Sequence, residues 1–311
     1  MALLNIVVTC SNRKKGDSRD FMRPPTSAGT TLRMRAMEWI DSLGHDCSSR
    51  LSPLELYAGD HWSIGKKLPA VASGRGWTPS LWIASAGYGL VSPEARLRPY
   101  SATFTLGKPD SVGTSVVQNR EWWKVLAEWA GPPGCRHRSM EAIAEVDPES
   151  TFLVVLSAPY LSALWDDLET ALRKVNDRNR FIVVSAGTSR LPGYQSNLLP
   201  GDSRLQATLG GALSSLSVRL ARHLLETYPP DRFTTETLSV GIQKLIGQAP
   251  ERVVANNAKM DDDEVIRFVR KTLKTEPKMS QTAMLRVLRQ SGKACEQSRF
   301  KELFQTAKDD S

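Results

Sequence analysis

The chain has 311 residues and a formal net charge of +8, with 41% hydrophobic and 24% charged residues. This composition is close to that of an ordinary globular protein, and it excludes a disordered, collagen-like or fibrous chain. Because single hydrophobic cores stop growing at about 250 to 300 residues, the length predicts one large body with a small appendage.

The longest apolar runs are strand-sized, for example residues 152–156 and 181–184. They are far shorter than the roughly 20 residues that a membrane-spanning helix needs. The first residues run into a strand-like sequence and lack the basic start and cleavage site of a secretory signal. The sequence therefore predicts a soluble, cytoplasmic protein with no membrane partner.

The cysteines and histidines argue against a metal centre or a disulfide framework. The chain has four cysteines with no C-x-x-C pair, and four histidines with no H-E-x-x-H spacing. Scattered cysteines of this kind are usually reduced thiols. We therefore expect no metal ligands and no cofactor. The cysteines are Cys10, Cys47, Cys135 and Cys295.

The first hundred residues predict strands and helices in the order strand, helix, helix, strand. A β-branched run at residues 6–9 indicates a buried strand that ends in a polar, basic loop. Apolar spacing predicts helices over 32–43 and 54–72, the second opened by Ser52-Pro53. Residues 80–90 read as a strand running into a glycine-bearing loop. This order is typical of an open α/β sheet.

The following segments continue the alternation. A tryptophan-rich helix is predicted over 113–130, and strands over 152–156 and 181–185 flank a helix at 161–175. A long loop follows residue 185, before a helix at 204–227. The predicted fold is therefore α/β, with a mixed or largely parallel sheet and flanking helices.

Residues 256–311 are expected to form a small, basic helical unit, distinct from an α/β body at residues 1–255. Helices are predicted at 281–289 and 296–307, joined by a Ser291-Gly292 turn. This pattern resembles a helix-turn-helix. A basic hairpin that only packs on the body fits the pattern equally well.

The charge of this last segment fits a nucleic-acid partner. Residues 266–311 hold eleven Lys or Arg and five Asp or Glu, a balance of +6. A concentrated positive surface attracts phosphate backbones, although a solvated helical face has the same composition. The expected DNA contacts are Arg286, Arg289, Lys293 and Arg299.

Three segments combine reactive side chains with glycine or proline: residues 10–14, 56–62 and 85–101. Together they supply a thiol, a lysine, an aspartate, a histidine, hydroxyls and three tyrosines. If the loops after the first two strands share one sheet edge, these groups converge on one crevice, where α/β proteins bind ligands.

Five short motifs in these and later segments resemble, in order, those of the YaaA family. Pro159 stands where that family has an acidic residue. The resemblance covers roughly the first 190 residues. The motifs are Ser11-Asn12-Arg13-Lys14, Gly59-Asp60 with Trp62, residues 85–93, Pro99-Tyr100 and residues 154–160.

The resemblance implies both a partner and a reaction. Members of the YaaA family are associated with DNA binding. One branch, DpdC, belongs to bacterial DNA 7-deazaguanine modification systems and acts on DNA that carries 7-cyano-7-deazaguanine. The implied activity is hydration of that nitrile to the 7-amido base. The implied partners are this DNA and other members of the same modification system.

The residues offer a metal-free route to such a hydration. A nitrile carbon is a weak electrophile, so the reaction needs a good nucleophile, an acid near nitrogen and a dry pocket. Cys10 could form a thioimidate as a thiolate, or Asp60 could activate water. Lys14 could lower the pKa of the thiol or protonate nitrogen. Alternatively, Cys10 is a buried structural cysteine and Asp60 only holds a loop.

The same segments offer contacts for an extruded base. Trp62, Tyr88 and Tyr100 are expected as stacking platforms, and Ser11 and Ser85 as further substrate contacts. The alternatives are that the tyrosines pack against loop backbone and that Ser85 is only a small residue at a close approach.

Two other functions compete with the hydratase. One is a non-catalytic DNA-binding protein of the same family. The other is a nucleosidase or transglycosylase-like enzyme that uses Asp60. His61, next to it, departs from the family pattern.

Overall fold

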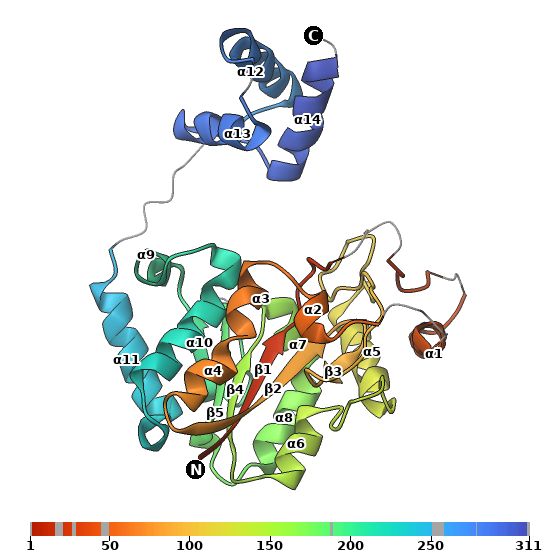
Figure 1. Cartoon of the computed structure of the whole chain (residues 1–311), viewed down its shortest axis with the longest axis vertical. Coiled ribbons are helices and arrows are strands. Elements are labelled where there is room, and N and C mark those ends of the chain that lie inside the picture. Colours follow the sequence, from red (N-terminus) through yellow and green to blue (C-terminus); the bar gives the residue numbers. More distant parts are fainter. Residues whose placement is uncertain are drawn as a thin grey trace. The chain divides into compact units, whose positions relative to one another are not determined.

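A six-stranded sheet forms the centre of the larger of two units, Met1–Pro250, and the second unit is Glu251–Ser311 (Figure 1). The expected boundary between residues 255 and 256 lies outside the described residues. The computed structural model describes residues 2–15, 21–26, 29–44, 50–186, 189–250, 258–277 and 279–309.

The strand order is β3-β2-β1-β4-β5-β6, and only the β2–β3 pair is antiparallel. This confirms the predicted α/β fold with a mixed, largely parallel sheet. The strands are β1 (Ala2–Thr9), β2 (Trp77–Ser85), β3 (Gly89–Val91), β4 (Thr151–Val155), β5 (Phe181–Ala186) and β6 (Leu198–Gly201).

The apolar runs in the sequence are the central strands. All of β4 is buried, as are Leu4 and residues 5–9 of β1. Strands covered on both faces read as continuous hydrophobic runs, which is why these segments could be recognised from sequence.

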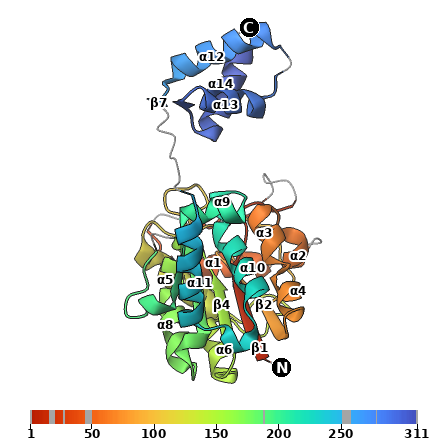
Figure 2. The same cartoon turned by 90° about the vertical axis from the view of Figure 1, so that its left-hand side faces the viewer.

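Helices cover both faces of the sheet, as Figure 2 shows. One layer holds α3 (Asp60–Gly65), α4 (Leu68–Ser73) and α10 (Leu216–Thr227). The other holds α1 (Leu32–Gly44), α5 (Val116–Glu128), α6 (Met140–Val146), α7 (Ala158–Ala163) and α8 (Trp165–Lys174). Helix α11 (Thr235–Gln248) packs beside the edge strand β6.

Two predicted helices are shorter than expected because glycines interrupt them. The single helix expected over 54–72 is three short ones: α2 (Pro53–Leu56), α3 and α4. Gly59 is the N-cap of α3 and has φ 98°, a positive value that residues with a side chain rarely adopt and that no helix contains. The helix expected from residue 204 begins as α10 only at Leu216, after α9 (Gln206–Leu209) and two glycines with positive φ.

Several elements carry weak sequence signals and were not predicted, among them β3, α6, β6 and α11. Strand β6 contains Pro200, which removes a backbone donor and is tolerated here because β6 is the edge strand. Helix α11 contains Gly241 and Gly247, which lower helix propensity.

The second unit is helical, as predicted, and has its own apolar core, which includes Val265, Leu285 and Phe300. The connection between its last two helices runs from Ser291 to Glu296. It is longer than the turn of about three to four residues in a helix-turn-helix. The elements are β7 (Ala258–Lys259), α12 (Asp262–Thr275), α13 (Gln281–Gln290), β8 (Lys293–Ala294) and α14 (Gln297–Asp309).

Among the helices of the described ranges, none is both long enough and apolar enough to cross a membrane.

Candidate active site

The strand order creates a crevice at the carboxyl end of β1. The chain runs from β1 to β2 on one side of the sheet and later returns to β4 on the other side of β1. Such a point, where the strand order reverses, separates the loops that follow β1 and β4. Open α/β sheets bind ligands at such switch points. The register places Val8 level with Ile83 and Val155, so the residues that follow all three strands lie at one edge.

A cavity of about 490 Å³ lies at this edge. Its volume falls within the range of about 300 to 1,000 Å³ that is usual for small-molecule sites. Most of the lining side chains are polar. The lining residues are Thr9, Cys10, Ser11, Asn12, Arg13, Asp60, His61, Thr103, Thr105, Ser157, Ala158, Tyr160, Ala186, Leu213, Ser214 and Ser217.

Cys10 is the thiol that lines this cavity. It directly follows β1, is 7% exposed, and lines the cavity. Its Sγ lies 3.1 Å from the Tyr160 hydroxyl and accepts a longer contact of 3.6 Å from the Tyr100 hydroxyl. Two phenol groups therefore surround the sulfur and can donate hydrogen bonds to a thiolate.

The two phenols belong to a buried chain of hydroxyl groups. The Tyr100 hydroxyl lies 2.9 Å from that of Tyr57 and 2.6 Å from Ser85 Oγ. Burial raises the pKa of Tyr57, Tyr100 and Tyr160 well above the ordinary value. All three phenols are therefore protonated at neutral pH and act as hydrogen-bond donors.

Lys14 lies behind this chain of hydroxyls. Its Nζ is 4.3 Å from the centroid of the Tyr100 ring and 5.8 Å from that of Tyr57. Burial lowers the pKa of Lys14, while the charges of Cys10 and Asp110 oppose that shift. Lys14 is not among the described residues that line the cavity. Lys14 is therefore placed to act on the sulfur through its charge, and the expected direct proton transfer to nitrogen does not fit its position.

The segment after β2 is held rigidly next to this chain. Trp122 Nε1 donates to the Ala86 carbonyl at 2.8 Å, and Trp39 Nε1 donates to the Gly87 carbonyl at 2.7 Å. Ser85 Oγ accepts from the Gly87 backbone N–H at 3.2 Å. The glycine-rich motif is therefore a support for the Tyr100 hydroxyl, rather than a loop that approaches a ligand.

Asp60 lines the cavity and is engaged in an ion pair. Its carboxylate accepts from Ser215 Oγ at 2.5 Å and from Arg219 at 2.9 and 3.0 Å. These bonds lower its pKa, the Ser215 hydrogen bond most strongly. A carboxylate held in this way is a weak base, so the expected role of Asp60 in activating water does not fit its partners. It instead joins the first turn of α3 to the start of α10.

The aromatic residues expected to stack on a base lie in the core. Tyr88 and Tyr100 are 0% exposed and Trp62 is 1% exposed. Tyr88 packs between Tyr100 and Trp129, and Trp62 packs edge-on against Tyr57. In this arrangement none of them offers a ring face to a ligand, and the stacking expectation does not fit. Ser85 is also fully buried, so only Ser11 of the expected substrate contacts reaches the cavity.

His61 and Tyr160 were not among the expected catalytic residues. His61 lines the cavity, its Nε2 lies 3.0 Å from Thr9 Oγ1, and burial lowers its pKa. His61 is therefore neutral at neutral pH and can act as a base. Tyr160 lies in the motif at residues 154–160. Its contact with Cys10 joins residues 150 positions apart, so the sequence alone could not reveal it.

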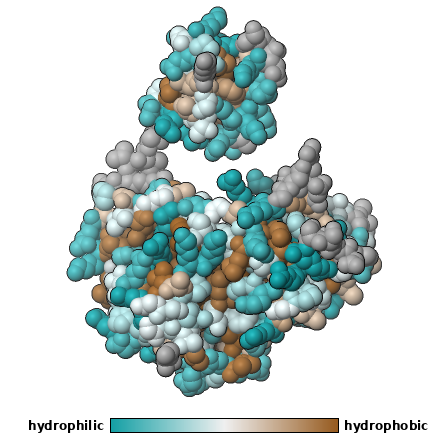
Figure 3. All heavy atoms as spheres, in the orientation of Figure 1, coloured by the Kyte–Doolittle hydropathy of each residue, from teal (hydrophilic) through white to brown (hydrophobic). Residues whose placement is uncertain are grey.

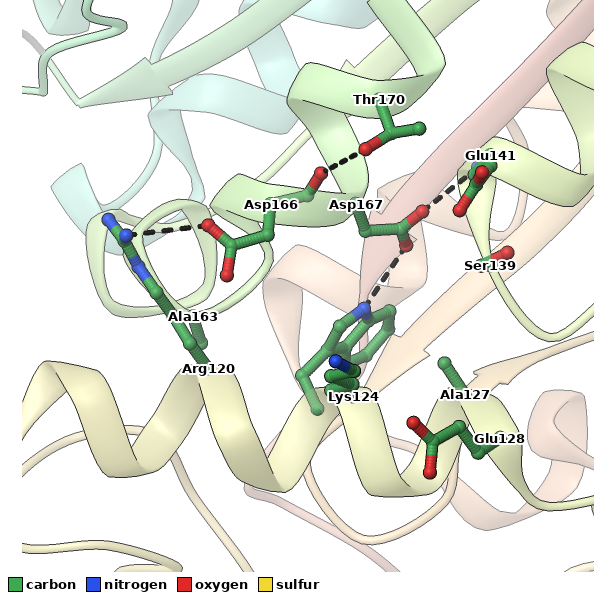
Figure 4. Close-up of a pocket in the computed structure, with 11 residues that line it drawn as sticks. Arg120, Lys124, Ala127, Glu128, Ser139, Glu141, Ala163, Asp166, Asp167 and Thr170 are labelled. Carbon is green, nitrogen blue, oxygen red and sulfur yellow. Dashed lines mark hydrogen bonds and ion pairs between the residues drawn. The ribbon is translucent and has the colours of Figure 1, made fainter.

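A second cavity, of about 460 Å³, lies between α5, α6 and α8, as Figure 4 shows (Figure 4). Asp167 lies at its centre. Its carboxylate accepts from Trp123 Nε1 and from the backbone N–H groups of Met140 and Glu141, at 2.9 to 3.1 Å. Burial raises the pKa of this carboxyl to about 6, and the three donors oppose the shift. The bonds join α8 to the start of α6, so Asp167 is a structural anchor.

The pKa of Asp167 predicts a pH-dependent contribution to stability. The folded carboxyl binds its proton more tightly than the unfolded one, so its contribution is present at low pH and declines as pH rises from about 4 through about 6. We expect the stability advantage of the wild type over Asp167→Asn to shrink over this range, measured by urea unfolding at pH 4.5 and 7. An advantage that grows with pH would show that the three donors favour the carboxylate.

The expected DNA contacts of the second unit differ in their availability. Arg286, Arg289 and Lys293 are exposed, and Arg289 donates to the Cys295 carbonyl at 3.3 Å. Arg299 pairs with the Asp262 carboxylate and donates to the Met260 carbonyl at 3.0 Å. Arg299 therefore joins α14 to the start of α12, and a role in phosphate binding does not fit these contacts.

Cys10, Cys135 and Cys295 are free thiols, and Cys47 lies outside the described residues. No group of three or more His, Cys, Asp or Glu side chains in the described part of the chain is arranged to hold a metal ion.

Comparisons with protein-family models, with curated proteins and with solved structures give no match for this chain. The similarity to the YaaA family thus rests on the sequence motifs alone.

Proposed function

We propose that the protein hydrates the nitrile of 7-cyano-7-deazaguanine in DNA to the 7-amido base, with Cys10 as the nucleophile. The observation that carries this proposal is a thiol in a cavity at the switch point of the sheet, with two protonated phenols at its sulfur. The choice of substrate follows from the resemblance of the motifs to those of the YaaA family. The cavity supplies a route that needs no clustered cysteines.

The first step is addition of the thiolate to the nitrile carbon. One C–S bond forms and one C–N π bond breaks, which places the electron pair on nitrogen. Tyr160 donates its proton to this nitrogen, because its hydroxyl is 3.1 Å from the sulfur and it lines the same cavity. The product is a thioimidate on Cys10.

The second step is addition of water to the thioimidate carbon. His61 accepts a proton from that water, since it is neutral and lines the same cavity as Cys10. The tetrahedral adduct takes the proton from His61 on its nitrogen and expels the thiolate, and the proton of its hydroxyl returns to Tyr160, which leaves the amide. One nitrile and one water give one amide, and the enzyme returns to its starting state.

The substrate is an extruded base, because a nitrile within a stacked duplex is not accessible to a buried thiol. Hydroxyl and amide groups at the cavity wall, such as those of Asn12, Thr103 and Ser157, are suited to bind polar base edges. Tyr160 is the aromatic residue at the wall, and its hydroxyl lies at the Cys10 sulfur. An enzyme that inserts the cyano base must act first, which fits a partner from the same modification system and a cytoplasmic location.

The pKa shifts predict a bell-shaped pH profile of kcat/KM. The pKa of His61 lies below 6.5, and activity rises as pH increases through it because His61 loses its proton and can act as a base. The pKa of Lys14 lies below 10.5, and activity falls as pH increases through it because the positive charge is lost. In Lys14→Met the positive charge is missing at every pH. We expect this variant to lose at least about tenfold in kcat/KM at pH 7, about 1.4 kcal/mol, and to lose the Lys14 alkaline limb.

The control for that profile is Lys14→Arg, which keeps a positive charge to higher pH. Its alkaline limb should move upward. A Lys14→Met profile with the wild-type alkaline limb would assign that limb to another group.

Labelled water tests the reaction type. In heavy-oxygen water, each product base should gain one labelled oxygen and keep its nitrogen. Release of ammonia would indicate hydrolysis to the acid instead. Release of free base from the strand would indicate the nucleosidase, a function that the ion pair of Asp60 with Arg219 does not favour.

A further inference from the structure

Helix α12 of the second unit carries a row of basic residues on its outer face. Arg267, Arg270, Lys271 and Lys274 are exposed and follow the spacing i, i+3, i+4, i+7, which places them on one side of a helix. The opposite side of the helix holds Val265 and Val269, which are fully buried in the core of the second unit. We call these four residues the α12 basic row.

The acidic residues of this helix and its cap lie at its first turn. Asp263 stands four positions before Arg267, which donates to the Asp263 carbonyl at 3.3 Å, and the other three have other partners. Asp261 and Glu264 form a capping box around the helix start. Asp262 pairs with Arg299 of α14. Beyond this turn, no Asp or Glu stands three or four positions from Arg270, Lys271 or Lys274 in the sequence. The basic row therefore has no neighbouring carboxylates on its own helix over its last two turns.

Solvated helical faces of the larger unit have a different charge pattern. On α8, Arg173 pairs with Glu169, and Lys174 contacts Glu141 and Glu145 of α6. On α10, Arg222 pairs with Glu226. Alternating charges are typical of a face that only meets solvent, whereas like charges at i and i+4 repel each other. The α12 basic row instead places exposed like charges three and four positions apart, an arrangement that suits a polyanionic partner.

We propose that the α12 basic row binds the phosphate backbone of duplex DNA. Seven residues of helix separate its ends, so the row is about 10 Å long. This length matches about three phosphate steps along one strand, at about 3.4 Å of duplex axis per step. Most of the visible surface of the second unit is hydrophilic, which suits a polar, charge-driven contact (Figure 3). The contact is independent of base sequence and does not require the nitrile chemistry.

The test is the salt dependence of binding between the full-length protein and an unmodified fluorescent duplex, followed by anisotropy. In the variant Arg270→Gln/Lys271→Gln/Lys274→Gln, the slope of log affinity against log salt should decrease by about 2 to 3, at about 0.9 for each lost phosphate contact. Affinity near 0.1 M salt should fall at least about tenfold.

Two control variants separate this contact from general charge and from misfolding. Arg75→Gln/Arg222→Gln/Lys244→Gln removes the same charge from exposed positions of the larger unit and should leave the slope nearly unchanged. Arg270→Lys/Lys271→Arg/Lys274→Arg keeps the charges and should bind like the wild type.

An equal loss in both glutamine variants would overturn the proposal, because the effect would then follow net charge alone. An unchanged slope in the α12 variant would also overturn it. Tighter binding of single-stranded RNA or of polyglutamate than of the duplex would assign the row to a different partner. Because the duplex is unmodified, failure of the hydratase proposal leaves this result unaffected.

Discussion

Replacement of Cys10 by alanine is expected to abolish hydration of the nitrile, with kcat/KM lower by about 10³-fold or more. The loss is large because no later step can proceed without the thioimidate, and removal of a nucleophile is among the costliest changes in an enzyme. Turnover is measured by nucleoside mass spectrometry after digestion of the DNA. Binding to DNA should remain, since Cys10 belongs to the larger unit's cavity and not to the α12 basic row.

Two further variants make this result specific. Cys10→Ser keeps a hydroxyl at the position that faces Tyr160, but it is a much poorer nucleophile and should be inactive while remaining folded. Cys135→Ala removes another free thiol of the same unit, one that does not line the cavity, and should stay active. Substantial turnover by Cys10→Ala would show that water attacks the nitrile directly.

Replacement of Gly87 by alanine is expected to cost about 1 to 3 kcal/mol of stability and to reduce turnover of the folded protein. A Cβ atom at this position would lie 2.5 Å from Cδ2 of the Tyr100 ring and closer still to Cε2. Tyr100 is fully buried and its hydroxyl holds three partners, so the ring cannot move without breaking contacts with Tyr57, Ser85 and Cys10. The free energy of unfolding in urea gives the first effect.

Gly74→Ala is the matched control for this change. A Cβ at Gly74 would have its nearest neighbours at 3.6 Å, which is ordinary contact, and its φ of −65° suits any residue. This variant should be as stable as the wild type. Equal stability of Gly87→Ala and Gly74→Ala would mean that the Tyr100 ring has room to shift.

The sequence predicted the sheet because its signals are local. Runs such as residues 152–156 are apolar on both faces, and that pattern arises where helices cover both sides of a parallel strand. Strand β6 was missed because its four residues include Pro200, so its place depends on the edge of a sheet that already exists. Glycines with positive φ at 59, 210 and 211 set helix ends that apolar spacing alone could not locate.

The site was predicted in composition but only partly in roles. The three segments rich in reactive side chains include Cys10, Lys14, Tyr57 and Tyr100, and the structure places these side chains in one cluster. Which aromatic rings face the cavity and which support it depends on burial, and both kinds look alike in a glycine-bordered loop. The partners of Asp60 come from residues 215 and 219, more than 150 positions away, where no motif pointed.

The central claim is tested most directly by incubating the purified protein with DNA that contains 7-cyano-7-deazaguanine, followed by nuclease digestion and mass spectrometry of the nucleosides. The account predicts that the modified nucleoside gains the mass of one water in the wild type and not in Cys10→Ala, with the strand intact. An unchanged nucleoside in the wild type, with salt-sensitive binding to the same DNA, would contradict the hydratase and favour a DNA-binding protein without catalysis.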